Sequence, residues 1–317
     1  MTDGQIYQGP IVDAHQHFWD PVSNPNPWLK PDVQIPFRYG DYSAIKRRYL
    51  PDDYFSDAAG HDIRETVYVE TEWDEHDPIG ETSYAMHLSE RYGVPNAIVA
   101  QAWLDRADIG PVLAAQAAFA LVRSVRHKPG GPQRPEDVGQ ARSLMSNDRW
   151  RQGFALLEQH GLHFDLQTPW WNLHEAEDLA RSFPRTTIVL NHAGLPSDRS
   201  EQGLKAWHAA MSNFAECPNV KVKISGIGQP GRSWTVEDNR WIIEEIVAMF
   251  GPGRAMFASN FPVDSLCGTF DTIYSGFKEI AAQYTDASQR ALFYGTASDT
   301  YRTGSVVEHE ARASIGG

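Results

Sequence analysis

Near the N-terminus stands the stretch Ile11-Val12-Asp13-Ala14-His15-Gln16-His17, a short apolar run that ends in two histidines. Similar short apolar runs recur along the chain, and each has the length and composition of a buried β-strand. Together with the first they make eight predicted strands: residues 11–17, 66–71, 97–103, 121–127, 163–168, 187–192, 220–225 and 255–259.

The segments between these runs have the period of amphipathic helices, and several end at a glycine. The clearest predicted helices are residues 83–92, 109–119, 148–160, 175–182, 204–215, 239–250 and 272–282. Regular alternation of strands and helices predicts βαβ units with a parallel sheet, and eight such units favour closure into a barrel. We therefore expect an α/β protein with the (β/α)8 or TIM-barrel fold. It would form a single domain over residues 1–303, followed by a disordered tail over residues 304–317.

A long segment, residues 18–54, directly follows the first predicted strand. It is rich in aromatic and proline residues and shows little helical period. A loop of this length inside a compact domain is usually functional and often forms a lid. The alternative is a surface loop that packs only for stability.

Composition narrows the classes of partner. The formal net charge of -13 argues against binding to nucleic acid or to an anionic membrane surface, and a small-molecule substrate is expected instead. No apolar run reaches the roughly 18 residues that a membrane span needs. The two cysteines and the polar first residues favour a cytoplasmic protein. A monomer and a homo-oligomer both stay open.

The histidines of the first strand are the sharpest chemical signal. Side chains alternate along a strand, so His15 and His17 are expected to point the same way. Facing inward, two imidazoles can hold one metal ion or polarise one substrate carbonyl. His192 lies in Asn191-His192-Ala193-Gly194, at the end of the sixth predicted strand. Active sites of such barrels form at the C-terminal ends of the strands, so His192 can reach the first pair. The competing interpretation is a set of hydrogen-bonded core histidines.

A third motif, Ala258-Ser259-Asn260-Phe261-Pro262-Val263-Asp264, ends the eighth predicted strand. Proline terminates a strand because it lacks the N–H that a sheet requires. Asn260 is expected to face the barrel mouth, and Asp264 follows in the next loop.

Taken together, these motifs resemble the amidohydrolase superfamily. The similarity is carried by D-A-H-Q-H-F-W at residues 13–19, N-H-A-G at 191–194 and S-N-F-P-V-D at 259–264. Two shorter stretches, Tyr49-Leu50-Pro51 and Val125-Arg126-His127, add to it. The pattern is most similar to the lactonase-like branch that includes sugar lactonases, pyrone-dicarboxylate lactonase and sulfomuconolactonase. The resemblance extends from Ile11 to about Arg302 and implies a TIM-barrel hydrolase that opens a lactone.

The sequence departs from the metal-dependent members of that superfamily at three strand ends. Those members resemble one another in a strand-four Lys or Glu, a strand-five His and a strand-eight Asp. Here the fourth strand ends in Arg126 and His127, the fifth in Gln167 and Thr168, and Asn260 stands where the Asp is expected. A binuclear site is therefore unsupported. Two alternatives stay open: one divalent ion, zinc by preference, on His15, His17 and His192, or a site without a metal.

The resemblance and the chemistry of the residues assign provisional roles. The three histidines polarise the carbonyl, and a carboxylate takes a proton from water. Asp264 is the first candidate for that base, since an asparagine amide is not a base at neutral pH, and Glu70 and Glu72 are rivals. Arg126 is expected to hold an acidic substituent, the alternative being an ion pair with Glu70 or Asp165. The predicted substrate-binding residues are Arg126, Asn260, Glu70, Gln167 and Trp73.

We thus predict a hydrolase that opens the lactone of a small acidic molecule by attack of water on the carbonyl. One alternative is a metal-dependent decarboxylase, or another enzyme of the superfamily that cleaves a carbon–carbon bond in an aromatic acid. The other alternative is a barrel that binds a small acid without catalysis.

Overall fold

The computed structural model describes residues 5–304, and its centre is an eight-stranded parallel sheet in sequence order. All eight predicted strands are confirmed, and each ends one or two residues earlier than predicted because the backbone leaves the sheet to form the loops of the mouth. The strands are β1 (Ile11–Gln16), β2 (Ile63–Val69), β3 (Ala97–Gln101), β4 (Val122–Arg126), β5 (His163–Leu166), β6 (Ile188–Leu190), β7 (Val220–Ile224) and β8 (Ala255–Phe257).

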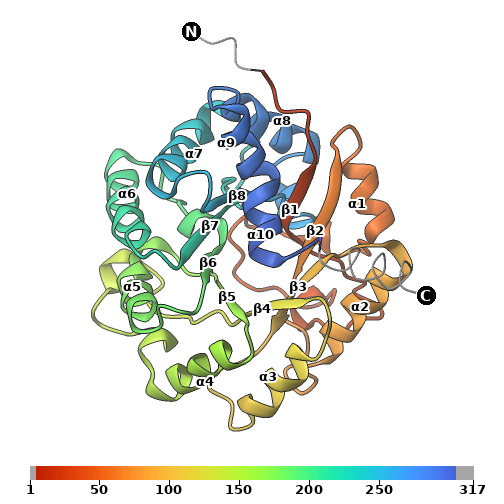
Figure 1. The fold of residues 1–317 in the computed structure, drawn as a ribbon, viewed down its shortest axis with the longest axis vertical. Helices are drawn as coiled ribbons and strands as arrows, with labels where there is room; N and C mark the ends of the chain where they lie inside the picture. The colour runs from red at the N-terminus through yellow and green to blue at the C-terminus, as the bar shows by residue number, and fades with distance from the viewer. Residues whose placement is uncertain (1–4, 305–317) are drawn as a thin grey trace, which may run out of the picture.

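Helices alternate with the strands and surround them as an outer ring (Figure 1). Side-chain caps start several of them: Asn147, Ser200, Thr235 and Thr269 accept a hydrogen bond from a backbone N–H in the first turn of the helix that follows. None of the described helices has both the length and the apolar character that a membrane crossing requires. The helices are α1 (Pro51–Asp57), α2 (Gly80–Tyr92), α3 (Ile109–Ala117), α4 (Asp148–Gln159), α5 (Leu173–Ser182), α6 (Glu201–Ala215), α7 (Val236–Phe250), α8 (Phe270–Ala281), α9 (Asp286–Arg290) and α10 (Thr296–Tyr301).

The seven predicted helices correspond to α2 through α8, whereas α1, α9 and α10 were not among them. These three helices are only 5–7 residues long, which is too short for a clear helical period. Helix α10 lies over the end of the barrel at which the strands begin (Figure 1). There Ala297 and Tyr301 pack against the inner side chains Val12 and Val67 and close the floor of the barrel. Apart from Gly304, the predicted disordered tail lies outside the described residues.

The barrel interior is divided into an apolar half and a polar half. Strands β1, β2, β3 and β8 contribute mainly small and branched apolar side chains to it. On the other side, Lys223 of β7 lies 2.7 Å from Asp165 of β5, and both side chains are fully buried. The Asp165 carboxylate also accepts hydrogen bonds from Ser124, Asn191 and Tyr301. Several donors therefore offset the cost of burying these two charges.

The barrel is closed by a short seam between β1 and the residues after β8. The Asn260 N–H donates to the His15 carbonyl at 2.7 Å, and the His17 N–H donates to the Phe261 carbonyl at 2.8 Å. Just below, the Ser259 N–H donates to the Asp13 carboxylate at 2.8 Å. The seam thus brings the two strand-one histidines next to Asn260.

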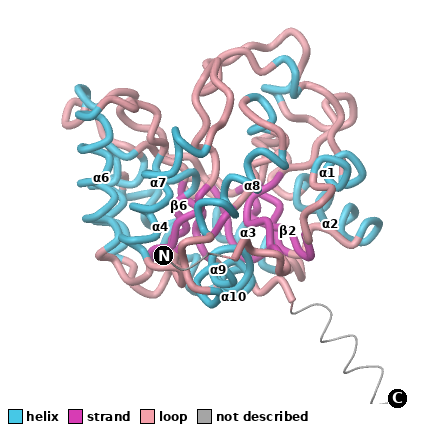
Figure 2. The backbone as a smooth tube through the Cα atoms, turned by 90° about the horizontal axis from the view of Figure 1, so that it is seen from above, coloured by secondary structure: helices cyan, strands magenta, loops and turns pink. Residues whose placement is uncertain are grey.

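Loops gather at the mouth of the barrel, on the side opposite α9 and α10 (Figure 2). The long segment after β1 is among them, because several of its residues line the cavity there. Its aromatic residues pack together: Trp19 forms a β-bridge with Tyr49, and Trp28 stacks on Phe37 with ring centroids 5.9 Å apart. Short 3₁₀ turns at Pro27–Leu29 and Ser43–Ile45 are its regular structure. The loop is therefore ordered by its own side chains, and it also forms one wall of the cavity described below.

The buried Lys223–Asp165 pair leads to a stability prediction. Replacing Asp165→Ala leaves the Lys223 ammonium buried without its counter-charge, so the free energy of unfolding should fall by about 3–5 kcal/mol. Urea denaturation followed by circular dichroism measures this change. The matched control is Glu158→Ala, which breaks the exposed ion pair between Glu158 and Arg185 and should cost about 1 kcal/mol or less. Equal losses in the two variants would contradict the role assigned to the buried pair.

Candidate active site

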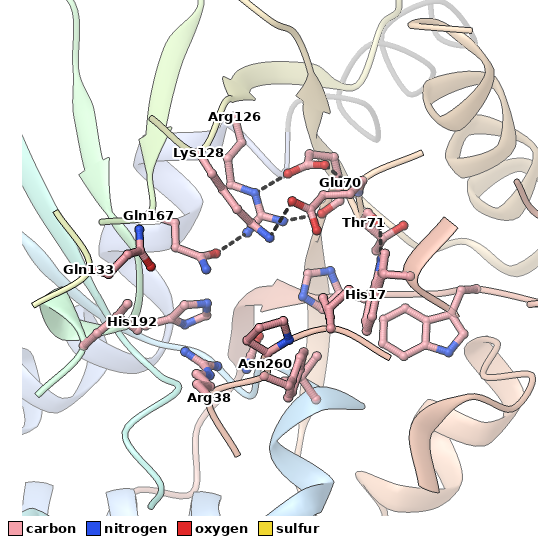
Figure 3. A pocket seen from close by; sticks show the side chains of 18 residues that line it. His17, Arg38, Glu70, Thr71, Arg126, Lys128, Gln133, Gln167, His192 and Asn260 are labelled. Atoms are coloured by element: carbon pink, nitrogen blue, oxygen red, sulfur yellow. Dashed lines mark hydrogen bonds and ion pairs between the residues drawn. The ribbon is translucent and has the colours of Figure 1, made fainter. Parts of the chain in front are cut away.

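A cavity of about 380 Å³ opens at the C-terminal ends of the strands. This volume falls within the range of about 300–1,000 Å³ that small-molecule sites occupy. His17 and His192 point into the cavity from different sides, with Arg38 and Asn260 beside them and Arg126 farther across (Figure 3). These side chains come from five different loops or strand ends, so only the closed barrel can assemble them.

The three predicted histidines are brought together by the fold. The ring of His15 lies 4.9 Å from that of His17 and 4.6 Å from that of His192, measured between centroids. All three rings are buried, and His15 lies behind the two that line the cavity. The contact between the His15 and His17 rings is consistent with the expectation that both side chains point to the same side of the strand.

The first strand is irregular where the histidines begin. Ala14 belongs to the apolar cluster of the barrel interior, and His15, its immediate neighbour, packs on His192. A regular pleat would send neighbouring side chains to opposite faces. The pairing of β1 with β2 shifts register between Asp13 and Gln16, and such a shift re-aims side chains near functional sites.

Burial and nearby cations keep the three histidines neutral. Burial, followed by the Arg126 guanidinium, lowers the pKa of His17 to about 3. Burial is also the main cause of the pKa values of His15 and His192 lying well below the usual range, with Lys223 and Arg38 as the next causes. An uncharged imidazole has one nitrogen with a free lone pair, so each ring can accept a proton or a hydrogen bond.

Hydrogen bonds fix the tautomer of His17. Its Nδ1 lies 2.7 Å from the carbonyl oxygen of Val69, which can only accept, so Nδ1 carries the proton and Nε2 has the lone pair. His192 Nδ1 lies 2.9 Å from the Ser225 hydroxyl, which can donate or accept. Neither ring nitrogen of His15 has a hydrogen-bond partner among the described residues.

The backbone is strained around the cavity. Glu72, His192 and Asn260 all line it, and all have φ between 54° and 57°, in the left-handed region. Asparagine tolerates this conformation, whereas glutamate and histidine do so at a cost of about 1–2 kcal/mol each. Such strain concentrates at sites where side chains must take a set direction.

Asp264, the first candidate for the general base, is fully enclosed by donors. Its carboxylate accepts hydrogen bonds from the Asn260 amide at 2.6 Å, the Tyr39 hydroxyl at 3.0 Å and the Gly226 N–H at 3.0 Å. Arg38 lies 3.5 Å away. Burial raises its pKa, but the carboxylate does not line the cavity. In this arrangement Asp264 joins four surrounding groups and has no oxygen directed at a substrate.

Arg126 and Glu70 form a buried ion pair, which is the alternative that the sequence left open for this arginine. The Arg126 guanidinium also donates to Gln167 at 3.0 Å. The second oxygen of Glu70 accepts from the Glu72 N–H at 2.7 Å. All of these side chains line the cavity, but the donors of Arg126 and the acceptors of Glu70 are largely occupied. Glu72 itself pairs with Lys128 at 2.9 Å and is partly exposed.

Trp73 lies away from the cavity. Its ring packs on Tyr84 of α2 with centroids 5.7 Å apart, and its N–H donates to Asp77 at 3.4 Å. It is therefore not brought together with the other predicted site residues.

Arg38 lines the cavity although the motifs did not single it out. One of its terminal nitrogens, Nη1, is buried without a hydrogen-bond partner among the described residues. The only signal in the sequence was its place in a long loop with several basic residues. Gly226 is a second missed residue, at φ 60°, and a Cβ there would lie 2.6 Å from His192 Nδ1 and 2.7 Å from Arg38 Nη2. The glycine thus makes room for His192 and Arg38 to lie side by side.

The residues present do not fit a divalent metal ion in this arrangement. Within residues 5–304, no group of three or more His, Cys, Asp or Glu side chains is placed to hold one ion. The histidines have no carboxylate in their set, and the nearby Lys223, Arg126 and Arg38 would repel a cation. The three rings meet, but within residues 5–304 they are not placed as ligands of one ion, so the mononuclear site on His15, His17 and His192 stays a prediction.

Solved structures share this architecture. An amidohydrolase from Burkholderia multivorans with bound zinc superimposes with a TM-score of 0.76 at 23% identity, covering 93% of this chain and 99% of that one. The 2,6-dihydroxybenzoate decarboxylase of Rhizobium matches with a TM-score of 0.59 at 14% identity, covering 93% and 99% of the two chains. At these identities the likeness shows the fold alone.

Comparison of amino-acid sequences identifies the family of this chain. An uncharacterised protein of Sinorhizobium fredii, y4mH, is 37% identical, with 92% of this chain and 98% of that protein covered. The L-fucono-1,5-lactonase of Burkholderia multivorans is 26% identical, with 92% and 95% covered. The model of the amidohydrolase family matches residues 12–303, almost the whole described chain. This chain therefore belongs to the amidohydrolase family.

Proposed function

We propose that the protein hydrolyses a lactone, with a water molecule attacking the ring carbonyl and the ring opening to a hydroxy acid. The observation that carries the proposal is the fixed tautomer of His17, which leaves a nitrogen lone pair at a cavity that Arg38 also lines. One N–H group of Arg38 has no hydrogen-bond partner among the described residues. The similarity to an L-fucono-1,5-lactonase supports the same reaction class.

His17 is the proposed general base. Its Nδ1–H is held by the Val69 carbonyl, so Nε2 keeps a lone pair that can take a proton. The Asn260 side chain interacts with the ring and can orient a water. The low pKa of His17 reflects burial and Arg126. Negative charge that develops on the substrate beside the ring would raise this pKa during the reaction, which makes the proton transfer easier.

Arg38 and His192 are the proposed stabilisers of the carbonyl oxygen. One buried N–H group of Arg38 has no partner within residues 5–304, and the guanidinium lies beside His192, where Gly226 leaves room for both side chains. Fixed donors aimed at developing negative charge contribute more than donors that must first reorganise. His15 has no contact with the cavity and acts by positioning the other two rings.

The proton and bond changes balance. Water gives a proton to His17 Nε2, and its oxygen forms a bond with the carbonyl carbon. The tetrahedral intermediate then collapses, the ring C–O bond breaks, and the departing alkoxide takes the proton from His17. The carboxylic acid that results then loses its proton to solvent. The carboxylate product meets a cavity with three cationic side chains, Arg38, Arg126 and Lys128, against two acidic ones, Glu70 and Glu72.

Two other functions stay as alternatives. A metal-dependent decarboxylase is supported by the fold shared with decarboxylases such as the dihydroxybenzoate enzyme, but residues 5–304 hold no matching set of metal ligands. A non-catalytic barrel would bind small acids without turnover. A panel of γ- and δ-lactones, with acid release followed by a pH indicator, tests for turnover directly.

The role of His17 predicts a large loss of activity in His17→Asn. Removing a general base typically lowers kcat by about 10²- to 10⁴-fold. Steady-state kinetics on a lactone that the wild type opens measures this loss, with circular dichroism to check folding. His76→Gln is the control, because His76 is 84% exposed and lies outside the cavity, and it should retain full activity.

Asp264→Asn tests the rival base within the same experiment. If Asp264 only anchors Arg38, the variant should raise KM more than it lowers kcat. A loss of kcat in Asp264→Asn as large as that expected for His17→Asn, together with near-normal turnover in the His17 variant, would identify Asp264 as the base instead.

The pKa shift of His17 predicts an unusual pH profile. The base form exists above the pKa and is lost only as the pH falls toward about 3. We therefore expect kcat/KM to stay level from about pH 8 down to about pH 5, after subtraction of spontaneous hydrolysis. A decline with its midpoint near the ordinary histidine value of 6.5 would contradict this assignment.

Chelation separates the lactonase proposal from the metal-dependent alternative. Because the site lacks a fitting ligand set, incubation with EDTA should leave lactone hydrolysis unchanged, and plasma mass spectrometry should find no stoichiometric metal. A full equivalent of bound zinc, with activity lost on its removal, would overturn this prediction.

A further inference from the structure

A second cavity of about 460 Å³ adjoins the proposed catalytic cavity. The two share seven wall residues, namely Pro36, Phe37, Arg38, Lys128, Gln133, Gln167 and Leu195. The remaining walls are Tyr39 and the loops that follow β4, β5, β6 and β7. A ligand held at the histidines can therefore extend into the second cavity without leaving the protein.

The second cavity has a different chemical character from the first. Its walls include five prolines as well as Phe37, Trp171 and Ile227, and among the described residues no acidic side chain lines it. Polar and cationic side chains complete the lining, namely Arg38, Tyr39, Lys128, Gln133, Gln167, Thr168, Asn172 and Ser197. Proline and aromatic side chains form rigid apolar surfaces with few hydrogen-bonding groups. Such surfaces suit a flat aromatic ring, which can stack on the Trp171 indole and on the prolines.

The aromatic wall is held in place. The Trp171 indole N–H donates to the Pro132 carbonyl at 2.8 Å, which ties the loop after β5 to the loop after β4. Two polar atoms of residues that line the cavity, Thr168 Oγ1 and Asn172 Oδ1, are buried without a hydrogen-bond partner among the described residues. Buried polar atoms normally have partners, so these two suit a ligand that carries a polar group.

We propose that this second cavity is a specificity subsite for an aromatic substituent on the lactone ring. The proposal rests on the function proposed above and narrows its substrate class. The lactone carbonyl lies between His17 and Arg38, and the substituent passes Arg38 and stacks in the cavity against Trp171 and the proline walls. The buried Thr168 and Asn172 atoms accommodate a hydroxyl group on that ring.

The test compares two δ-lactones that differ only in one substituent, phenyl or methyl. In the wild type we expect kcat/KM for the phenyl lactone to exceed that for the methyl lactone by about tenfold or more. In Trp171→Ala this preference should fall to about threefold or less while the methyl lactone is opened at nearly the wild-type rate. Equal kcat/KM values for both lactones in the wild type would overturn the proposal.

The neighbouring tryptophan provides a matched control. Trp170 stacks edge-on against Trp171 with centroids 5.5 Å apart but lines neither of the two cavities. Trp170→Ala should therefore keep the preference for phenyl, and Trp171→Phe should restore much of it by returning an aromatic face. Loss of the preference in Trp170→Ala and Trp171→Ala alike would mean that the loop, rather than the Trp171 ring, is responsible, and would overturn the assignment.

A binding measurement keeps the subsite testable if neither lactone is opened. Calorimetric titration with the two hydroxy acids, phenyl- and methyl-substituted, reports on the cavities without catalysis. Tighter binding of the phenyl acid that depends on Trp171 would support the subsite even if the proposed hydrolysis fails. Equal binding of both acids would reject the subsite and leave the hydrolase proposal to the lactone panel.

Discussion

The closure of the barrel between β1 and β8 is the constraint on which the site depends. Two backbone hydrogen bonds, from Asn260 to His15 and from His17 to Phe261, join the ends of the sheet. These bonds involve the same residues whose side chains line or support the cavity. A barrel that failed to close would therefore separate His17 from Asn260. The same two hydrogen bonds thus close the fold and hold the site together.

A second constraint is the balance of charge at the mouth. The site combines neutral histidines with buried cations, and Lys223, Arg126 and Arg38 all disfavour protonation of the rings. Asp264 offsets part of this positive charge, yet it does so from behind the cavity wall. Its carboxylate links the loop after β1, the loop after β7 and the end of β8. We infer that its main task is to keep Arg38 in place, which explains how a carboxylate can matter without touching the substrate.

The fold was predictable from the sequence because its signals are local and repeated. Eight apolar runs separated by amphipathic segments identify the strands, and the position of His15, His17 and His192 at strand ends predicts that they meet. Interactions between distant segments were not predictable in the same way. For Arg126, the sequence left open both substrate binding and an ion pair, and the structure shows the pair with Glu70. The donors that enclose Asp264 include Tyr39, which lies more than 200 residues away in the chain, and no periodic pattern in the sequence indicates such a contact. Trp73 was predicted to bind the substrate but packs on Tyr84 instead. A shift of one residue at a strand end turns a side chain to the other face, and the sequence does not reveal such a shift.

Arg38 shows why the long loop after β1 belongs to the chemistry and not only to the stability of the mouth. Its guanidinium lines both cavities, lies beside His192 and is held by Asp264. The loop that brings it there is ordered by stacked aromatic rings, which hold a cation at low entropic cost and also form an apolar wall. The loop after β1 can thus bind the lactone carbonyl in the first cavity and the ring substituent in the second. Because the histidines are fixed by the barrel, changes in this loop can alter which lactone is accepted without disturbing the base that opens it.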